Sequence, residues 1–564
     1  METTLAIFAT GTAALALLLP KLRERFELSR AKHRSLAGHS RMSRLAAAQV
    51  PYYEYDGVRF FDSDGAPAEV AALRYTGFAR LSDLYRQRFA ETARVTAGAR
   101  AGLSDLQFTA NYRVPFQYRR FVRGRLDAGS FVRSSSGVCL VDLDGNQLYD
   151  LTGSYGVNVF GVDFYKKCMA EGSARAAELG PVLGAYHPSV AYNVRRLQEI
   201  SGHEEVSFHM SGTEAVMQAV RLARYHTRRS HLVRFCGAYH GWWGDVQPGV
   251  GNPVPARDTY TLSEMSENTL RVLRKRRDIA CVLVNPLQAL HPNASAPGDG
   301  ALVASGRKAG FDRAAYTEWL RQLREVCTER GIVLIFDEVF VGFRLAMGGA
   351  QEYFGVRADL VTYGKTLAGG FPVGAVCGPH RWMTRFREDR PADICFARGT
   401  FNSHPYVMGA MQVFLEHLET EAGQAVYRDL DATWDGRAAR LNERLAAESI
   451  PVQVANLSSI WTVFYTQPSR YNWMLQYYLR AEGIALSWVG TGRFIFSLNY
   501  TEADFEAVVD RFLAAARAMK AEGWWWSDPA LTNRSIGRGI LREMIRHRFS
   551  RAADGPSGQS VARA

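Results

Sequence analysis

The sequence predicts an α/β protein in which a large domain with a mainly parallel sheet is followed by a smaller α+β domain. Short apolar runs rich in β-branched residues recur at 231–236, 279–285, 331–337 and 359–364. Segments with helical periodicity separate these runs, and buried strands that alternate with helices are typical of parallel βαβ units. After about residue 415 the alternation ends, and a mixture of helices and strands is expected.

The individual elements follow from local patterns along the chain. Helices are expected at 214–226, 314–330, 406–419, 424–447 and 502–520, and strands of the smaller domain near 451–465 and 492–498. The turn Asp144-Gly145-Asn146 predicts a hairpin of two strands within 131–153, because Asp-Gly pairs favour tight hairpin turns. A second hairpin is expected at Asp62-Ser63-Asp64-Gly65.

Length and composition exclude several classes of protein. The chain has 564 residues, which is more than one ordinary domain, and its 47% hydrophobic and 22% charged residues are typical of a globular protein. A disordered chain, a collagen and a polytopic membrane protein are therefore excluded. The seven cysteines form no Cys-x-x-Cys pair, so neither a metal site nor a disulfide framework is expected, and a reducing compartment fits best.

The first twenty residues are expected to be a membrane anchor. Residues 3–20 carry no charge and would form roughly 27 Å of helix, about the thickness of the hydrocarbon core of a bilayer. Eight Lys or Arg against two Glu follow within residues 21–50, which places the body of the protein on the cytoplasmic side. The alternatives are an apolar helix docked on the protein's own surface and a secretory signal peptide.

Changes in composition divide the chain into six parts. They are an anchor at 1–20, a basic helical extension at 21–100, a segment at 101–157 that joins the small domain, a large domain at 158–415, a small domain at 416–523 and a tail at 524–564. Residues 531–564 carry seven Arg, and Trp524, Trp525 and Trp526 precede them. Trp beside Arg is favoured at membrane interfaces, whereas the alternative is that these rings pack on the small domain.

Reactive side chains stand at the ends of two of these apolar runs and after the stretch VSFHM at 206–210. Ligands of parallel α/β sheets bind at the carboxyl ends of strands, so the residues after each run are informative. Ser211-Gly212-Thr213 opens a helix and offers backbone N–H groups to an anion such as a phosphate. Asp337 ends an apolar run and needs a cationic partner there. Lys365 lies in a glycine-rich turn, where loss of water favours the neutral amine that can form an imine.

Each of these features also has an ordinary structural explanation. The helix start can be a simple N-cap, the aspartate can form an internal ion pair, and the lysine can lie on a surface loop. Tyr239, after the run 231–236, can stack on a planar ligand or pack in the core. Taken together, a phosphate cup, a buried acid, an imine-forming lysine and a stacking ring are what pyridoxal 5′-phosphate requires.

Several stretches resemble class III aminotransferases, most of all the glutamate-1-semialdehyde 2,1-aminomutase branch. They are SGTEAVMQAVRLARYHT (211–227), FCGAYHGW (235–242), DEVFVGFRLAMGGAQEYFGVRADLVTYGKTLAGGFPVGA (337–375) and GTFNSHP (399–405). The resemblance implies a PLP-dependent transferase of fold type I, with a seven-stranded, mainly parallel sheet. It also implies a homodimer whose subunits share their active sites.

The resemblance further implies a role for each matching residue. Lys365 would join the aldehyde of the cofactor as a Schiff base and act as the general base, while Asp337 would pair with the pyridine nitrogen. Tyr239 and Val339 would contact the two faces of the ring. The remaining cofactor contacts would come from Ser211, Gly212, Thr213 and, across the dimer, Thr400 of the neighbouring subunit.

Departures from the family pattern bear on the substrate. Gln107 stands where the aminomutases carry an arginine for the substrate carboxylate, and Tyr155 replaces a family Trp; with His240 they are the expected substrate contacts. Loss of that arginine, together with an anchor, favours a hydrophobic or carrier-bound aldehyde or ketone, aminated in lipid or secondary-metabolite biosynthesis. Three nearby arginines could replace the missing one: Arg113, Arg119 and Arg120.

Two other functions remain open from the sequence. An aminomutase would move the amine within one molecule instead of taking it from a separate small-molecule donor. A membrane-tethered scaffold that has lost turnover is the non-enzyme alternative, although intact Lys365, Asp337 and Thr213 favour an enzyme. No nucleic-acid-binding motif accompanies the basic ends, so no nucleic-acid partner is expected.

Overall fold

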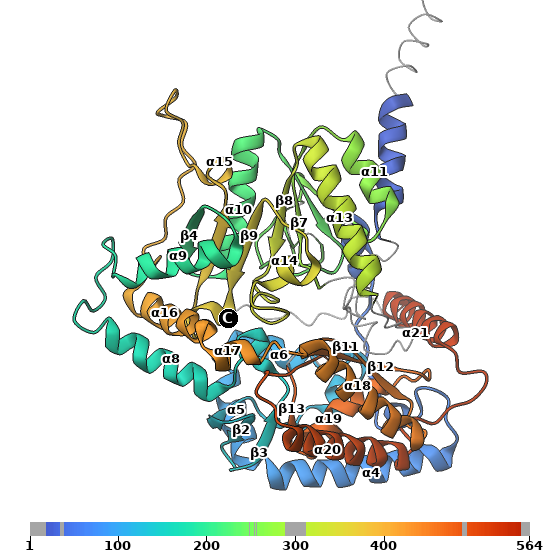
Figure 1. Cartoon of the computed structure of the whole chain (residues 1–564). Helices are drawn as coiled ribbons and strands as arrows, with labels where there is room; N and C mark the ends of the chain where they lie inside the picture. The colour runs from blue at the N-terminus through green and yellow to red at the C-terminus, as the bar shows by residue number, and fades with distance from the viewer. Residues whose placement is uncertain are drawn as a thin grey trace, which may run out of the picture.

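Three hydrophobic clusters organise the described chain, two in the larger part and one in the smaller part (Figure 1). The computed structural model describes residues 19–33, 39–287 without Pro248, Pro253 and Pro255, 312–487 and 493–553. Most of the expected membrane anchor, residues 1–18, lies outside the described residues. Within the described ranges, no helix combines the length and the apolar character needed to cross a bilayer.

A seven-stranded sheet forms the centre of the larger part. Its order is β4-β10-β9-β8-β7-β5-β6, and only β10 runs antiparallel to its neighbours. The strands are β4 (Glu205–His209), β5 (His231–Phe235), β6 (Thr259–Leu262), β7 (Ile279–Val284), β8 (Val333–Asp337), β9 (Leu360–Gly364) and β10 (Gly374–Gly378). The mainly parallel sheet predicted from the apolar runs is therefore confirmed.

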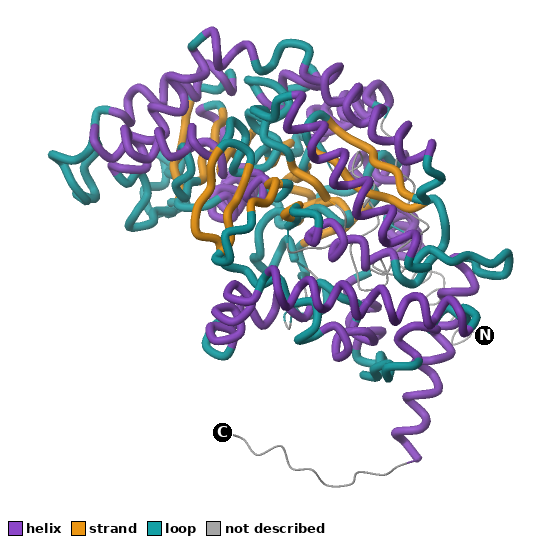
Figure 2. Tube along the Cα trace, turned by 90° about the horizontal axis from the view of Figure 1, so that it is seen from below, coloured by secondary structure: helices purple, strands orange, loops and turns teal. Residues whose placement is uncertain are grey.

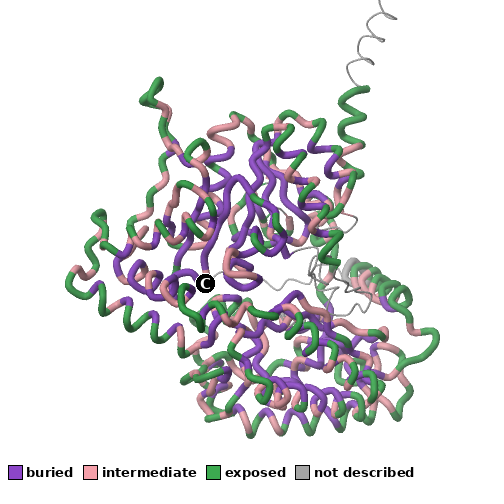
Figure 3. The backbone as a smooth tube through the Cα atoms, viewed as in Figure 1, coloured by how far each residue is buried: buried purple, intermediate pink, exposed green. Residues whose placement is uncertain are grey.

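Helices cover both faces of this sheet (Figure 2). They are α8 (Val162–Arg175), α9 (Ser189–Ser201), α10 (Gly212–Thr227), α11 (Glu267–Lys275), α13 (Arg313–Arg330), α14 (Gly349–Phe354), α15 (His380–Met383) and α16 (Pro405–Glu419). Side chains alternate along β8, so Ile335 packs with α10, whereas Leu334 and Phe336 pack with α13 and α16. The strands are consequently buried on both faces (Figure 3).

The smaller part contains two small sheets and several helices. The strand order of the first sheet is β1 (Val132–Ser136), β2 (Cys139–Asp142), β3 (Gln147–Asp150) and β13 (Ile484–Ala485). The strand order of the second sheet is β11 (Val452–Leu457), β12 (Ile460–Tyr465) and β14 (Arg493–Ile495). The helices are α17 (Glu421–Ala425), α18 (Leu430–Ala447), α19 (Leu475–Ala481) and α20 (Glu502–Ala521). The expected hairpin within 131–153 is thus part of a three-stranded meander.

Helices from the N-terminal region pack on the core of the smaller part. Residues of α3 (Arg59–Asp62), α4 (Ala68–Arg88) and α7 (Arg119–Val122) belong to that core. The other helices of this region are α2 (Ser40–Ala47), which has no buried residue, α5 (Ala90–Arg100) and α6 (Ser104–Tyr112). Phe60, Phe78 and Tyr85 belong to one buried cluster with Trp434 and Phe512. Most of the helices expected at 21–100 therefore complete the small domain instead of standing apart from it.

The hairpin expected at 62–65 is wrong, because this turn joins two helices. Gly65 donates its N–H to the carbonyl of Asp62 at the end of α3, and α4 follows. Asp64 in the turn is buried and forms an ion pair with Arg74 of α4 at 2.8 Å. An Asp-Gly turn indicates a change of direction, and the buried ion pair determines that helices flank it here.

The tryptophans before the tail face the protein interior. Trp524 and Trp525 belong to the core of the smaller part, and their ring N–H groups donate to the hydroxyl of Tyr478 (2.6 Å) and the amide oxygen of Asn472 (3.0 Å). Packing on the small domain, one of the two interpretations of these residues, is therefore what the structure shows.

The final helix, α21 (Asn533–Ala553), is attached to the smaller part through Glu543. Its carboxylate accepts hydrogen bonds from Arg470 at 3.0 Å and from the hydroxyl of Tyr55 at 2.6 Å. Burial alone would raise the pKa of Glu543, but the hydrogen bond and charge of Arg470 lower it to about 2. The ion pair therefore stabilises the folded protein at neutral pH.

We expect the substitution Glu543→Gln to lower the free energy of unfolding by about 2–3 kcal/mol at pH 7. A carboxyl with a lowered pKa stabilises above its unfolded value near 4.3, and this contribution is lost as pH falls towards about 2. Chemical denaturation at pH 7 and at pH 3 measures the difference, which should shrink at the lower pH. The control Asp83→Asn, in an exposed pair with Arg86, should change stability little. Equal effects of both substitutions at pH 7 would contradict this prediction.

Candidate active site

Asp337 and Lys365 meet where two neighbouring strands end. Asp337 is the last residue of β8 and lies opposite Thr362 of β9, while Lys365 follows β9 directly. The parallel pairing of β8 with β9 brings both carboxyl ends to the same edge of the sheet. The two residues on which the sequence prediction depends are therefore neighbours in space.

A buried histidine supports Asp337. The Nδ1 atom of His240 donates a hydrogen bond to Oδ2 of Asp337 at 2.7 Å, and both side chains are buried. Oδ1 of the same carboxylate accepts from the backbone N–H of Val339 at 3.1 Å. Burial lowers the pKa of His240, which favours the neutral ring. His240 thus lies against Asp337 and positions it, and its predicted contact with substrate stays a prediction.

The amine of Lys365 is held in a defined place. Its backbone has a φ of +48°, an uncommon conformation that the turn imposes. Nζ donates to the backbone carbonyl of Tyr155 at 2.6 Å and lies 4.5 Å from the centre of the Phe340 ring. Burial lowers the pKa of Lys365 to about 8, although the charge of Asp337 opposes this shift. At pH 7 roughly a tenth of the amine is therefore uncharged, far more than for an ordinary lysine.

This lowered pKa predicts how the apoprotein takes up an aldehyde. Only the neutral amine forms an imine, so the rate of reconstitution with pyridoxal phosphate should rise with pH and level off above about 8. An ordinary lysine would still accelerate up to its usual pKa of about 10.4. Stopped-flow absorbance at several pH values locates the midpoint, and a midpoint near 10 would refute the assigned environment of Lys365.

A glycine-lined cradle lies at the N-terminus of α10. A Cβ atom added to Gly212 would lie 2.6 Å from Val339, and one added to Gly241 would lie 2.5 Å from the hydroxyl of Thr213. Ser211 is the N-cap of α10, because its hydroxyl accepts from the N–H of Glu214 at 3.3 Å. The positive end of the helix dipole and its unpaired N–H groups favour an anion there.

Not all of the remaining predicted residues lie at the site. Tyr239 is 60% exposed, and Val339 lies between Gly212 and Asp337. Thr400 is exposed on the segment between α15 and α16. Gln107 is exposed on α6 and donates to the carbonyl of Arg100 at 2.9 Å. Gln107 therefore does not lie at the site. Its side-chain amide instead donates a hydrogen bond to a backbone carbonyl at the end of α5.

Sequence reasoning missed three residues around the lysine. Phe340 lies under Nζ, and the positive charges of Arg344 and Arg493 both lower the pKa of Lys365. Arg344 is buried and donates to the carbonyls of Phe496 (2.7 Å) and Asn158 (2.8 Å). The segment 337–344 carries Phe340 and Arg344, but their contacts with the small domain follow only from the three-dimensional arrangement.

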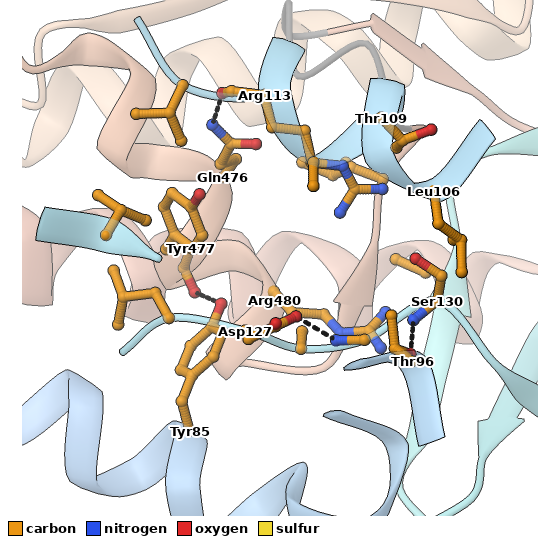
Figure 4. Close-up of a pocket in the computed structure, with 18 of the residues that line it drawn as sticks. Tyr85, Thr96, Leu106, Thr109, Arg113, Asp127, Ser130, Gln476, Tyr477 and Arg480 are labelled. Carbon is orange, nitrogen blue, oxygen red and sulfur yellow. Dashed lines mark hydrogen bonds between the residues drawn. The ribbon is translucent and has the colours of Figure 1, made fainter. Parts of the chain in front are cut away.

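A cavity of about 380 Å³ lies among the N-terminal helices and α19, with Arg113, Asp127 and Arg480 in its lining (Figure 4). Tyr155 and Thr152 form part of its wall, and the carbonyl of Tyr155 accepts the hydrogen bond from Lys365. The opposite wall comes from α5, α6 and α19.

The residues at these strand ends fit pyridoxal phosphate. The lysine amine suits its aldehyde, the carboxylate of Asp337 suits a protonated ring nitrogen, and the α10 cradle suits its phosphate. Gly212 and Gly241 allow the close approach of Val339 and Thr213 around the start of α10, because a Cβ atom at either glycine would collide with them. The site thus has the features of a fold type I PLP enzyme.

Comparison with known proteins gives the family. Residues 123–516 match the model of the family described as "Aminotransferase class-III". The glutamate-1-semialdehyde 2,1-aminomutase of Geotalea daltonii is 30% identical over 413 residues, which cover 68% of this chain and 90% of that protein. The chain therefore belongs to the class III aminotransferases, and it is a PLP-dependent transaminase.

Solved structures support the same assignment. A transaminase with PLP bound superposes with a TM-score of 0.63 at 26% identity, covering 77% of this chain and 99% of the other. An omega-transaminase from Sphaerobacter thermophilus gives 0.62 at 25% identity, with 78% and 99% covered. The fold predicted from the strand and helix pattern is thereby confirmed as fold type I.

Proposed function

We propose that this protein transfers an amino group from a small-molecule amine to an aldehyde or ketone. The observation that carries the proposal is the amine of Lys365, partly uncharged near neutral pH, next to the His240-supported carboxylate of Asp337. Pyridoxal phosphate, when bound, supplies an aldehyde that condenses with amines and a ring that withdraws electrons from the adjacent carbon.

The chain's own residues have three tasks in this reaction. Asp337 keeps a proton on the ring nitrogen, and His240 fixes the orientation of its carboxylate at 2.7 Å. Gly212 and Thr213 bind the phosphate at the start of α10. The neutral amine of Lys365 takes a proton from the substrate carbon and returns it to a neighbouring atom, while Tyr155 orients Nζ.

The second part of the proposal is the chemical class of the carbonyl acceptor. A hydrophobic or carrier-bound carbonyl compound of lipid or secondary-metabolite biosynthesis is the acceptor proposed here. Exposed aromatic rings next to the site support it, since Tyr239 is 60% exposed and Tyr155, at 50%, also lines the cavity. Such rings favour an apolar or planar group over water.

A second candidate is movement of an amine within one molecule. The similarity to proteins named glutamate-1-semialdehyde 2,1-aminomutase favours it. A scaffold without turnover is disfavoured by the intact pairing of Asp337 with His240 and by the lowered pKa of Lys365. A structural relic would not need either arrangement.

One experiment separates these candidates. The purified holoprotein is mixed with ¹⁵N-labelled amines, and the absorbance of the cofactor reports conversion from its aldehyde to its amine form. Transfer predicts conversion by an external donor and ¹⁵N in the product formed with a carbonyl acceptor. Unlabelled product made from a single amino-carbonyl compound would favour the aminomutase. If no amine changes the absorbance, the scaffold is favoured.

We propose that two copies associate through the segment between α15 and α16. Three large apolar side chains are exposed there close to Thr400: Ile394, Phe396 and Phe401. Burying such a patch between copies would bring Thr400 of one subunit towards the other subunit's phosphate cradle. Sedimentation should give a dimer for the native protein and a smaller species for Phe396→Ser, and a native monomer would refute this association.

We also propose that α21 associates with anionic membrane surfaces. Leu541, Ile545 and Phe549 form an exposed apolar row on this helix, which lies at the margin of the molecule (Figure 1). Exposed arginines recur every four residues beside that row: Arg534, Arg538, Arg542 and Arg546. Apolar and cationic rows together are typical of interfacial helices. Co-sedimentation with anionic but not neutral vesicles should occur and should fail for Phe549→Ser.

A further inference from the structure

One aromatic ring contacts three cationic side chains near the end of β9. The Nζ atom of Lys365 lies 4.5 Å from the centre of the Phe340 ring, and the guanidinium carbons of Arg344 and Arg493 each lie 6.0 Å from it. Cations within about 6 Å of a ring centre are attracted by the negative face of the ring. Phe340 therefore lies where three positive charges converge.

Both arginines stay charged at neutral pH. Burial lowers the pKa of each guanidinium to about 10, which is still well above 7. Arg344 follows β8 in the larger part, whereas Arg493 begins β14 of the smaller part. Their charges disfavour a proton on Lys365, and the charge of Asp337 favours it. A protonated Lys365 amine is therefore repelled from both parts of the protein and attracted by a single carboxylate.

The surroundings of Phe340 hold its ring close to the lysine. The ring is half-buried and packs against the core of the larger part. It also meets Gly156, where an added Cβ atom would lie 2.5 Å from the ring and 3.5 Å from Cδ of Lys365. Gly156 has a φ of +98°, a conformation that favours glycine. The backbone at Gly156 therefore fits directly against the ring and keeps it beside the lysine side chain.

The charge on Nζ changes during the amine transfer proposed above. As the general base, Lys365 takes a proton from the substrate carbon, the electron pair of that C–H bond stays on the carbon, and Nζ becomes an ammonium. The same proton then passes to a neighbouring atom, and the amine is neutral again. The carbonyl of Tyr155 accepts a hydrogen bond from Nζ in either state, whereas the ring face of Phe340 attracts only the ammonium.

We propose that Phe340 is a positioning residue of this transfer, and that the face of its ring holds the protonated amine of Lys365 in place while that amine carries the proton. The proposal rests on the amine transfer proposed above and gives it a residue whose side chain has no polar atom. Phe340 thereby offsets the repulsion from Arg344 and Arg493 at the step in which this repulsion is largest.

The first test measures the protonation of Lys365 in the apoprotein. Brief acetylation with acetic anhydride at several pH values, read by mass spectrometry of the Lys365 peptide, gives the midpoint at which the amine becomes reactive. The native midpoint should lie near 8. The midpoint of Phe340→Leu should be about 0.5–1 pH unit lower, because leucine fills space but offers no ring face to the ammonium. Phe340→Tyr should keep the native midpoint, and an unchanged or higher midpoint in Phe340→Leu would overturn the proposal.

The second test separates turnover from substrate binding in the holoprotein. Phe340→Leu should lower kcat about tenfold and change the KM for the amine by less than about twofold, since the ammonium forms only after the substrate has bound. Phe340→Tyr should recover most of kcat. Native kcat in Phe340→Leu, or equal losses in the two variants, would show that the ring face is not what matters and would refute the role of Phe340.

A second phenylalanine provides the matched control. Phe354 of α14 is buried, and its ring packs against those of Tyr316 and Tyr353. Phe354→Leu should lower the melting temperature and leave the midpoint of Lys365 and kcat near native. A midpoint shift as large as that of Phe340→Leu would trace the effect to a loosened core and contradict the proposal. If thermal melting shows that Phe340→Leu is misfolded, Phe340→Met takes its place under the same criteria.

The two measurements keep this role separate from the transfer itself. If the native holoprotein converts no amine but the midpoint falls in Phe340→Leu, the proposed transfer fails and the hold of the ring on the ammonium stands. If amines are transferred while the midpoint and kcat of Phe340→Leu match the native values, the role of Phe340 fails and the transfer stands.

Discussion

The substitution Lys365→Ala should lower the turnover of amine transfer by about 10⁴-fold or more. The same nitrogen attaches the cofactor and moves the proton, so its loss removes covalent binding and general-base catalysis together. No other described lysine occupies the end of β9, where burial lowers the pKa of Nζ to about 8. Steady-state kinetics with a donor and an acceptor measure the loss.

A second measurement tests the covalent bond itself. After borohydride reduction, the native protein should carry the mass of the reduced cofactor, and the Lys365→Ala protein should not. The control Lys167→Ala, an exposed lysine on α8, should retain both activity and the added mass. Turnover within tenfold of native in Lys365→Ala would contradict the assignment of this residue.

The substitution Asp337→Asn should lower turnover by about 10³-fold while the fold is retained. The amide has nearly the same shape and can still accept from the N–H of Val339, but it carries no charge to keep a proton on the ring nitrogen. His240→Asn should have a smaller effect, because His240 acts through Asp337 at 2.7 Å. The kcat of each variant, measured with saturating cofactor, gives the comparison.

A buried carboxylate away from the site provides the control for Asp337. Asp359 precedes β9 and forms an ion pair with Arg324 at 2.8 Å. Asp359→Asn should lower the melting temperature and leave kcat near native. If Asp337→Asn behaves like Asp359→Asn, its role is structural and the proposed chemistry at the ring nitrogen is wrong.

Local pattern was sufficient for the large sheet and for much of the site. The parallel strands β5, β7, β8 and β9 coincide with the four apolar runs, whereas β6, with the sequence TYTL, is not such a run. The topology places whatever follows these runs at one edge. Asp337, Lys365 and the start of α10 could be selected for that reason. Gly212 could be selected too, because a turn before a helix favours anions, whereas Gly241 was not predicted.

Contacts between residues far apart in the chain could not be predicted from local sequence patterns. His240 has no neighbour in sequence that indicates its bond to Asp337, 97 positions away. Arg344 contacts the small domain through backbone carbonyls, which carry no sequence signature. The cavity joins α5 and α6 to α19, segments separated by hundreds of residues. In the same way, the turn at 62–65 was mistaken for a hairpin because the ion pair of Asp64 depends on tertiary packing.

The two ends of the chain share one core, and this has a consequence for biosynthesis. Ser63 donates its hydroxyl to Tyr471, Arg74 donates to the carbonyl of Gly523, and Glu543 closes the same region from α21. A ribosome releases the first of these partners long before the last one is made. The apolar surfaces of α3 and α4 are therefore covered completely only after Gly523 and Glu543 have been made, so this core forms late.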